Sequence, residues 1–333
     1  MPNTSGLVLA DDATGALECA SLLAGLNLHV SLVIDETLRP GIQVVDTESR
    51  HLPPDEAAAR IRQWLAHNPG SVFKKTDSTL RGNIAAELLA MLSTRPIVYI
   101  PAYPAVGRTV IDGQLFVHGR RTSRIAEVFP ANSPIEAIQD AAGLAAALSN
   151  PTPRILICDA ASNADLDQLA AVLGPSTWLA GPAGFIPYWA ALNTFLSGHP
   201  PSLPKPEKWL IVCGSRHPQS RRQANYAEVV GLPVLRTSDE DQDDPEQVAA
   251  NLARDAIRRL EIENPDAILI MGGDTVWAIW RSLGITEIEP LPEILPGIAA
   301  CLSPERNLLF VTKAGAFGDD RLVETVLERC NRT

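Results

Sequence analysis

The chain has 333 residues, 39 of them acidic and 28 basic, which gives a formal net charge of −11 at pH 7. This length suits two domains that each bury a core. The acidic balance argues against a nucleic-acid partner, because such binding depends on Lys and Arg neutralising phosphates, but a few local cations can still hold a small anion in a cleft.

The N-terminus and the cysteines predict a cytoplasmic protein. Met-Pro-Asn-Thr-Ser leads straight into a short apolar run, without the basic and long apolar regions of a signal peptide, and no stretch is long enough to cross a membrane. Widely spaced cysteines without a C-x-x-C pair favour buried free thiols in a reducing compartment. These cysteines are Cys19, Cys158, Cys213, Cys301 and Cys330.

Short apolar runs alternate with helical patterns through the first half of the chain. We expect strands over Leu7–Ala10, Val30–Ile34, Ser71–Phe73, Ile97–Ile100 and Ile155–Cys158. We expect helices over Thr14–Leu26, Pro54–His67, Asn83–Leu92, Pro134–Leu148 and Ala164–Leu173. This alternation is typical of a mostly parallel sheet covered by helices.

Polar loops follow three of these strands. They are Asp11-Asp12, the run from Lys74 to Asn83, and Pro101 to Thr109 with Arg108. Ligands of open α/β sheets bind at the carboxyl ends of strands, where a carboxylate could act as general base or hold a metal ion and basic side chains could bind a small carboxylate. The alternative is that one Asp caps the helix beside the predicted N-cap Thr14, while the other Asp and the loops are merely solvated.

A proline-rich stretch predicts the domain boundary. Residues 197–206 contain four prolines, which can neither continue a helix nor pair in a central strand. We therefore expect one domain over residues 1–200 and a second over 207–333, with strands at Trp209–Cys213, Ala267–Met271 and Leu308–Thr312. The predicted fold is α/β, two domains that are each a mostly parallel sheet flanked by helices, with the active site in the cleft between them.

Each strand of the second domain ends in a glycine-rich turn. The turns are Cys213–Arg216, Gly272–Thr275 and Lys313–Gly318. Backbone N–H groups in such turns, together with a helix dipole, suit the phosphates of a nucleotide. None of the turns is a Walker A or a G-x-G-x-x-G motif, and Asp274 and Thr275 could instead cap a helix while Lys313 pairs with an acid.

The combined motifs resemble those of the four-carbon acid sugar kinases. The matching segments are Ala10-Asp11-Asp12-Ala13-Thr14-Gly15-Ala16, Lys74 to Asn83, Pro101-Ala102-Tyr103-Pro104 with Gly107-Arg108-Thr109, Gly272 to Thr275, Glu293 to Gly297, and Lys313 to Gly318. The Lys-x-Asp-Ser-Thr-Leu-Arg-Gly block is the specific part of this likeness, because glycine turns alone are common.

The resemblance implies a phosphotransferase with an alcohol acceptor. The N-terminal domain would bind a tetronate such as threonate, erythronate or an oxo-tetronate, and the C-terminal domain would bind ATP with Mg²⁺. Phosphate would pass to the terminal hydroxyl. The partners expected are the sugar acid and ATP, with no nucleic acid and no membrane, and a homo-oligomer is compatible with the sequence.

Site residues follow from the same likeness and from the turns above. The catalytic candidates are Asp12 and Arg81; the substrate-binding candidates are Asp11, Lys75, Asp77, Ser78 and Arg108. The nucleotide-binding candidates are Ser215, Gly272, Gly273, Asp274, Thr275, Lys313, Gly315 and Gly318. No metal ligand is assigned, and the choice of Asp12 as general base over Asp11, Asp77 or Asp274 stays open.

The chain departs from the family pattern in its shorter length and in two turns. Ala316 stands in Gly315-Ala316-Phe317-Gly318 where Asn is usual, and Val276-Trp277 stands where Ser-Gly is expected. Trp277 could crowd a nucleotide or pack elsewhere. Two alternatives therefore accompany the kinase: a non-catalytic sugar-acid-binding protein, and a nicotinamide-dependent dehydrogenase, which would lack its usual dinucleotide motif.

Overall fold

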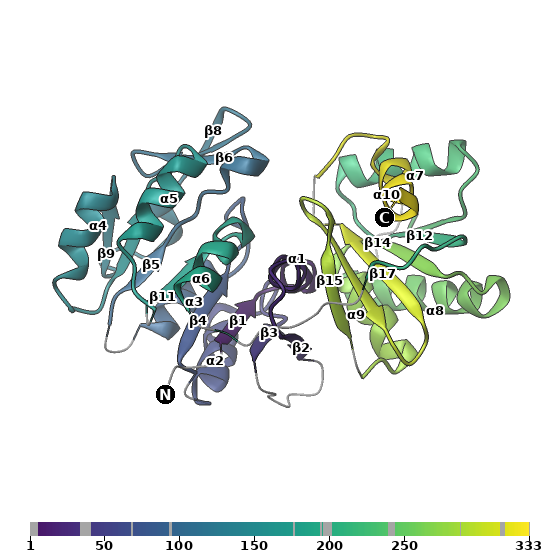
Figure 1. Ribbon diagram of the computed structural model, residues 1–333, viewed down its shortest axis with the longest axis horizontal. Helices are drawn as coiled ribbons and strands as arrows, with labels where there is room; N and C mark the ends of the chain where they lie inside the picture. The colour runs from purple at the N-terminus through teal and green to yellow at the C-terminus, as the bar shows by residue number, and fades with distance from the viewer. Residues whose placement is uncertain are drawn as a thin grey trace.

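A computed structural model describes most of the chain. The described residues are 6–33, 41–67, 69–92, 95–175, 177–193, 195, 202–238, 244–286, 288–313 and 317–332. They form two large sheets, each flanked by helices, and one small antiparallel sheet (Figure 1).

The first sheet has eight strands, all parallel, in the order β2-β3-β1-β4-β11-β5-β10-β9. Its strands are β1 (Gly6–Ala10), β2 (Val30–Val33), β3 (Ile42–Asp46), β4 (Ser71–Lys75), β5 (Ile97–Tyr99), β9 (Ile135–Ile138), β10 (Ile155–Cys158) and β11 (Trp178–Gly181). Every residue of β1 and β4 is buried, because helices cover both faces of the sheet.

Among its described residues, the first half also contains six α-helices, three 3₁₀ turns and the small sheet. The helices are α1 (Ala13–Gly25), α2 (Pro54–Leu65), α3 (Ile84–Met91), α4 (Ala141–Leu148), α5 (Asn163–Ala171) and α6 (Ile186–Leu192). The turns are η1 (Pro104–Val106), η2 (Ile125–Val128) and η3 (Ala183–Phe185), and the small sheet is β6 (Arg108–Ile111), β7 (Gln114–Val117) and β8 (Arg120–Arg124).

The second large sheet has six strands in the order β13-β12-β14-β17-β16-β15, the first four parallel and the last two antiparallel. Its strands are β12 (Trp209–Cys213), β13 (Val234–Arg236), β14 (Ala267–Met271), β15 (Glu289–Leu295), β16 (Ile298–Ser303) and β17 (Leu308–Lys313). Its helices are α7 (Pro218–Val229), α8 (Pro245–Glu263), α9 (Gly273–Leu283) and α10 (Leu322–Arg332).

Helix α1 joins the two halves of the molecule. It lies between the first sheet and β15 (Figure 1), and its residues 13–21 are all buried because both halves cover it. The Ser21 hydroxyl, within this helix, donates to the Ala300 carbonyl of β16 at 3.0 Å and accepts from the Ala300 N–H at 3.1 Å. Apolar packing is also continuous from the first sheet through α1 to α9.

The expected two-domain α/β fold is confirmed, and several local predictions need correction. The predicted helix Pro134–Leu148 is wrong in its first part, where Ile135–Ile138 forms edge strand β9 and Asp140 caps a shorter helix. Asp12, rather than Thr14, is the N-cap of α1. The sequence analysis did not predict strands β3, β6 to β9, β11, β13, β15 and β16.

Other expectations concern the ends of elements and the boundary between domains. Strand β2 is described to Val33, and Ile34 lies outside the described residues, as do residues 197–201 of the proline-rich stretch. The domain limits 1–200 and 207–333 stay a prediction. All five cysteines are buried and unbridged, and no helix in the described part of the chain is both long and apolar enough to traverse a bilayer.

Candidate functional site

Two neighbouring strands bring the first polar loops together. Strands β1 and β4 pair in parallel, with Leu9 opposite Lys74, so the loops that follow both strands leave the same edge of the sheet. The predicted residues Asp11, Asp12 and Asp77 therefore lie close to one another, as the shared ion pairs below show.

Arg50 is the centre of this cluster, and the sequence analysis missed it. Its Nε and Nη2 donate to the two oxygens of Asp11, both at 2.9 Å, and its Nη1 donates to Asp12. Nη2 also lies 3.8 Å from Asp77 Oδ2. Arg50 follows β3, which pairs with β1, and no local motif marks it. One guanidinium thus holds three carboxylates together.

Asp11 is buried and charged. Its side chain is 1% exposed, and burial by itself raises the pKa of its carboxyl, but the charges of Arg50 and Lys74 outweigh that effect and hold the pKa below its usual value. Asp11 is therefore a buried anion that anchors Arg50, and its predicted contact with a substrate stays a prediction.

Asp12 is fixed at the N-terminus of α1. Its Oδ1 accepts the Gly15 N–H at 3.0 Å, and its Oδ2 accepts the Thr14 hydroxyl at 2.7 Å as well as Arg50. The alternative reading of the Asp pair, in which one residue caps the helix, is thus correct for Asp12. Because its side chain is still 15% exposed, the carboxylate caps the helix and remains partly accessible.

The loop after β4 is held in an unusual conformation by Asp77. The Asp77 carboxylate accepts from the Thr79 N–H at 2.8 Å and from Arg81 Nε and Nη2 at 3.1 and 2.6 Å. Leu80 between them has a φ of +66°, which is uncommon for a residue with a side chain and recurs at functional sites. Burial raises the pKa of Asp77, but Arg81 and Arg50 lower it well below its usual range.

Arg81 and Lys75 differ in how they could meet a ligand. The Arg81 side chain is 60% exposed and so remains accessible. The Lys75 side chain is 6% exposed; its Nζ donates to the Thr76 carbonyl at 3.1 Å and lies 3.7 Å from Glu18. Lys75 is therefore buried, and its predicted contact with the sugar acid stays a prediction. Ser78 is half-buried in the same loop.

Arg108 reaches the second half of the molecule. Only 6% of it is exposed, its Nη1 donates to the Val106 carbonyl and lies 3.1 Å from His118 Nε2, and its guanidinium stands 5.6 Å from the ring centroid of Phe317. No ion pair of Arg108 with a carboxylate occurs among the described residues. A buried guanidinium of this kind can receive an anionic ligand.

The glycine turns of the second half meet at the N-terminus of α9. The N–H groups of Gly214 and Ser215 both donate to the Met271 carbonyl, at 3.0 and 2.9 Å. Gly272 precedes α9 without a capping side chain, so Asp274 and Thr275 do not cap the helix as the alternative reading had it. Asp274 is exposed and Thr275 is buried. The first turn of α9 is thus open to an anion.

Lys313 and Gly318 lie at the end of the same sheet. Lys313 Nζ donates to Ser220 Oγ at 2.9 Å, and burial lowers the pKa of this ammonium to about 8. Gly318 has a φ of +76° and follows Phe317. Gly315 lies outside the described residues, so its predicted contact with a nucleotide stays a prediction.

The two halves converge at Asp12. A methyl group added to Gly273, the first residue of α9, would lie 3.5 Å from Asp12 Oδ2. Nearby, burial lowers the pKa of His217, and the positive charges of Lys313 from the second half and Arg81 from the first lower it further. The junction therefore combines an oriented carboxylate, an open helix N-terminus and cations from both sides.

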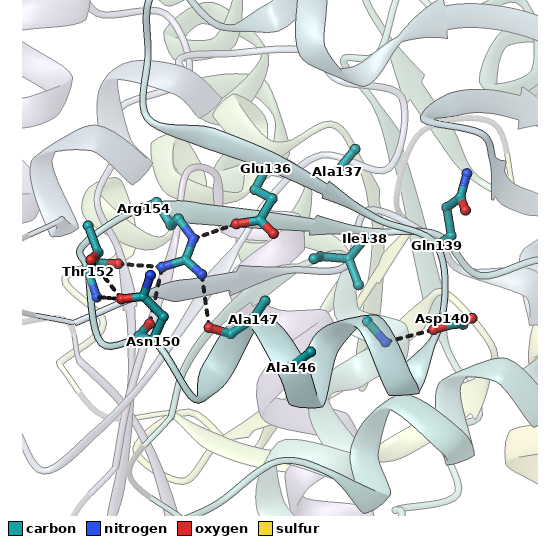
Figure 2. A pocket seen from close by; sticks show the side chains of 11 residues that line it. Glu136, Ala137, Ile138, Gln139, Asp140, Ala146, Ala147, Asn150, Thr152 and Arg154 are labelled. Carbon is teal, nitrogen blue, oxygen red and sulfur yellow. Dashed lines mark hydrogen bonds and ion pairs between the residues drawn. The ribbon is translucent and has the colours of Figure 1, made fainter.

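An open groove of about 680 Å³ lies elsewhere, at the outer edge of the first sheet between β9 and α4 (Figure 2). Its arginine, Arg154, is already bound to Glu136 and to the carbonyls of Asn150, Thr152 and Ala147. We attach no chemistry to this groove, because its cation is satisfied and none of the predicted site residues lines it.

Two further observations concern the packing around Gly214 and the side chains that could bind a metal ion. A methyl group on Gly214 would lie 2.0 Å from Thr275 Oγ1, so the turn beside the N-terminus of α9 admits no side chain at this position. Within the described ranges, no group of three or more His, Cys, Asp or Glu side chains is placed to hold a metal ion.

Two family models match the chain. A sugar-binding N-terminal domain matches residues 6–135, and a nucleotide-binding C-terminal domain matches residues 234–323. These ranges contain, respectively, the carboxylate cluster around Arg50 and the N-terminus of α9.

Curated relatives span nearly the whole chain. A D-threonate kinase of Cupriavidus necator is 28% identical, with 95% of each chain covered. A 3-oxo-tetronate kinase of Haemophilus influenzae is 25% identical, with 95% of this chain and 98% of the relative covered. A solved structure from Salmonella typhimurium LT2 has a TM-score of 0.72 at 21% identity and covers 98% of both chains, which shows the same fold.

Proposed function

Because the chain belongs to the four-carbon acid sugar kinase family, we propose that it transfers phosphate from ATP to the terminal hydroxyl of a four-carbon sugar acid. Threonate, erythronate and an oxo-tetronate are the acceptors to test, since relatives that cover nearly the whole chain are named threonate and 3-oxo-tetronate kinases and an erythronate kinase matches a shorter part.

The observation that carries the proposal is the meeting of α9 with Asp12. Phosphoryl transfer depends mainly on alignment and charge neutralisation. Here the uncapped N-terminus of a helix comes from the half that matches a nucleotide-binding domain, and the oriented carboxylate comes from the half that matches a sugar-binding domain. A phosphate bound at the N-terminus of α9 would lie beside a hydroxyl bound at the Asp12 carboxylate.

On this proposal, the N-terminal half binds the acid. Arg81 is the accessible cation of the carboxylate cluster, and Arg108 is the buried cation without a carboxylate partner in the described part of the chain. Either can bind the carboxylate of the substrate. Asp12 remains partly accessible while Arg50 and Thr14 orient it, so we assign to it the removal of the hydroxyl proton.

The C-terminal half binds the nucleotide phosphates on this proposal. The backbone N–H groups of Gly273, Asp274 and Thr275 and the positive end of the α9 dipole favour a polyanion, and Lys313 adds a positive charge behind the turn. Mg²⁺, when bound, would neutralise charge on the transferred phosphate. Asp274, the exposed carboxylate of this turn, is the residue that we expect to hold it.

The proposal is tested by measuring ADP formation from ATP and Mg²⁺ with a panel of three- to six-carbon sugar acids and their oxo derivatives. We expect turnover with one or two four-carbon acids. Asp12→Asn should lower kcat at least about a hundredfold, because general-base catalysis is worth about 10²- to 10⁴-fold, while Arg81→Ala should chiefly raise the KM of the acid.

An exposed residue outside the cluster provides the control. Arg258→Ala on α8 removes a surface pair with Asp255 and should leave kcat and KM as in the wild type. If a sugar acid raises the thermal stability of the protein, while ATP does not and no ADP forms, the protein is a non-catalytic sugar-acid-binding protein.

A further inference from the structure

Trp277, which departs from the family pattern, points toward the other half of the molecule. Its indole Nε1 donates to Asp46 Oδ2, at the end of β3. One helical turn later, Arg281 stacks on the Trp277 ring, with its guanidinium 5.5 Å from the ring centroid, and pairs with Glu48 at 2.5 Å. The bulky residue therefore makes contacts between the two halves.

These contacts lie along one face of α9. Gly273, Trp277 and Arg281 are four residues apart in succession, so a helix places them in one row. The first member of the row lies against Asp12, and the other two bind the loop after β3. The row joins the open N-terminus of α9 to the acid-binding half.

The loop that receives this row is short and firmly held. Asp46 Oδ1 accepts the Glu48 N–H at 2.7 Å, and Glu48 has a φ of +49°. The Thr47 hydroxyl donates to the Ala10 carbonyl at 2.8 Å, and the Arg50 N–H donates to the Asp11 carbonyl at 3.2 Å. The same loop therefore carries the α9 contacts at its start and Arg50 at its end.

We propose that Trp277 and Arg281 are positioning residues that form a latch between α9 and the loop of residues 46–50. Through this latch, the position of α9 beside Asp12 and the position of Arg50 depend on each other. The latch consists of the Trp277–Asp46 hydrogen bond and the Arg281–Glu48 ion pair. Trp277 thus holds the two halves closed around the site. This role in turnover rests on the proposed kinase function, whereas the closure itself does not.

Two variants weaken the latch while preserving the surrounding packing. Trp277→Phe keeps an aromatic ring under Arg281 and removes the N–H donor; Glu48→Gln keeps the shape of a half-exposed side chain and removes its charge. Arg259→Ala is the matched control, because it removes an arginine that pairs with Glu263 within α8 and touches neither half of the latch.

Closure is measured first, by small-angle X-ray scattering of the protein without substrates. We expect a larger radius of gyration for both latch variants than for the wild type, and no change for Arg259→Ala. The open form should gain up to about tenfold in Trp277→Phe, because the Asp46 oxygen loses its donor, and only about twofold in Glu48→Gln, because its ion pair with Arg281 is largely exposed.

Kinetics then separate positioning from simple loss of folded protein. We expect the KM values of ATP and acid to rise up to about tenfold in Trp277→Phe and about twofold in Glu48→Gln, with kcat within about twofold of the wild type. A variant that is merely less folded would lose kcat at unchanged KM. In a double-mutant cycle, adding Asp46→Ala, which removes the accepting oxygen, to Trp277→Phe should cost little more than either change alone.

Wild-type scattering and wild-type KM values in both latch variants would overturn the proposal. Should Trp277→Phe fail to fold, Glu48→Gln on the surface still decides the question. Should the wild-type protein transfer no phosphate to any acid, the kinase proposal fails by itself, and the scattering comparison alone decides the latch.

Discussion

A single guanidinium organises the carboxylates of the site. Asp11 is 1% exposed and would be costly to bury as an anion, yet Arg50 binds both of its oxygens and also reaches Asp12 and Asp77. The cluster therefore holds three carboxylates that repel a nearby anion less strongly than three free carboxylates would. Its stability depends on Arg50.

Arg50→Ala should destabilise the protein by about 3–5 kcal/mol, because it leaves the buried Asp11 carboxylate without its partner. The free energy of unfolding from urea titration measures this. Arg222→Ala, which removes an exposed pair with Asp320, should leave stability nearly unchanged. An Arg50→Ala protein as stable as Arg222→Ala would mean that Asp11 is not charged in the folded state.

Two helix N-termini face each other across the site. Helix α1 begins with Asp12 as its cap, and α9 begins at Gly273 without a capping side chain. Both positive dipole ends therefore favour negative charge in the same region. The cap of α1 comes from the side chain of Asp12, whereas the turn before α9 consists of glycines and supplies no capping side chain.

Gly214→Ala should weaken nucleotide binding by about tenfold or more and leave acid binding unchanged. The added methyl group would lie 2.0 Å from Thr275 Oγ1, so the first turn of α9 must move, and a shifted turn loses aligned N–H donors. Isothermal titration calorimetry with ATP and with the acid measures both affinities.

Gly174→Ala is the control, because a methyl group there would meet nothing within 4 Å. Equal ATP affinities in the Gly174 and Gly214 variants would exclude the turn before α9 as the phosphate site.

The two halves of the molecule share buried charges as well as apolar packing. Glu293 of β15 faces α1, where burial and then the charge of Glu18 raise the pKa of Glu293 from 4.5 to about 8. Glu18 lies beside Lys75 of the first sheet, and the Gly297 N–H donates to Glu293 Oε1 at 3.2 Å. The junction thus favours a protonated Glu293.

Stability should fall as pH rises from about 4.5 to 8. The folded protein holds the Glu293 proton in this window while the unfolded chain, with its ordinary pKa, releases it; raising the pH therefore favours unfolding. We expect a loss of about 2 kcal/mol between pH 6 and pH 8, since each unit of pKa difference is worth about 1.4 kcal/mol and partial exposure reduces the effect. Urea titrations at both pH values measure it.

Glu293→Gln keeps a side-chain oxygen for Gly297 and cannot ionise. Its stability should change less between pH 6 and pH 8 than that of the wild type, and the difference isolates Glu293 from Glu18. Parallel pH profiles for the two proteins would show that Glu293 is already charged in the folded state.

Local sequence determined the strands that end in polar loops and the chemical character of those loops. Buried parallel strands such as Leu7–Ala10 and Ala267–Met271 are continuous apolar runs, and Asp11-Asp12 and Gly272-Gly273 follow them directly, so neighbouring residues suffice to locate them. The division into an acid-binding and a nucleotide-binding half was accessible for the same reason.

Only the tertiary structure decided which of these side chains meet. Arg50 carries no local signal and becomes central because β3 pairs with β1, while Lys75, a predicted substrate-binding residue, is buried beside Glu18. Strand β9 was mistaken for helix because its pairing with β10 outweighs the helical pattern of the residues that follow. Trp277 acquires its partner Asp46 only when the halves pack, since contacts between residues far apart in sequence depend on the fold as a whole.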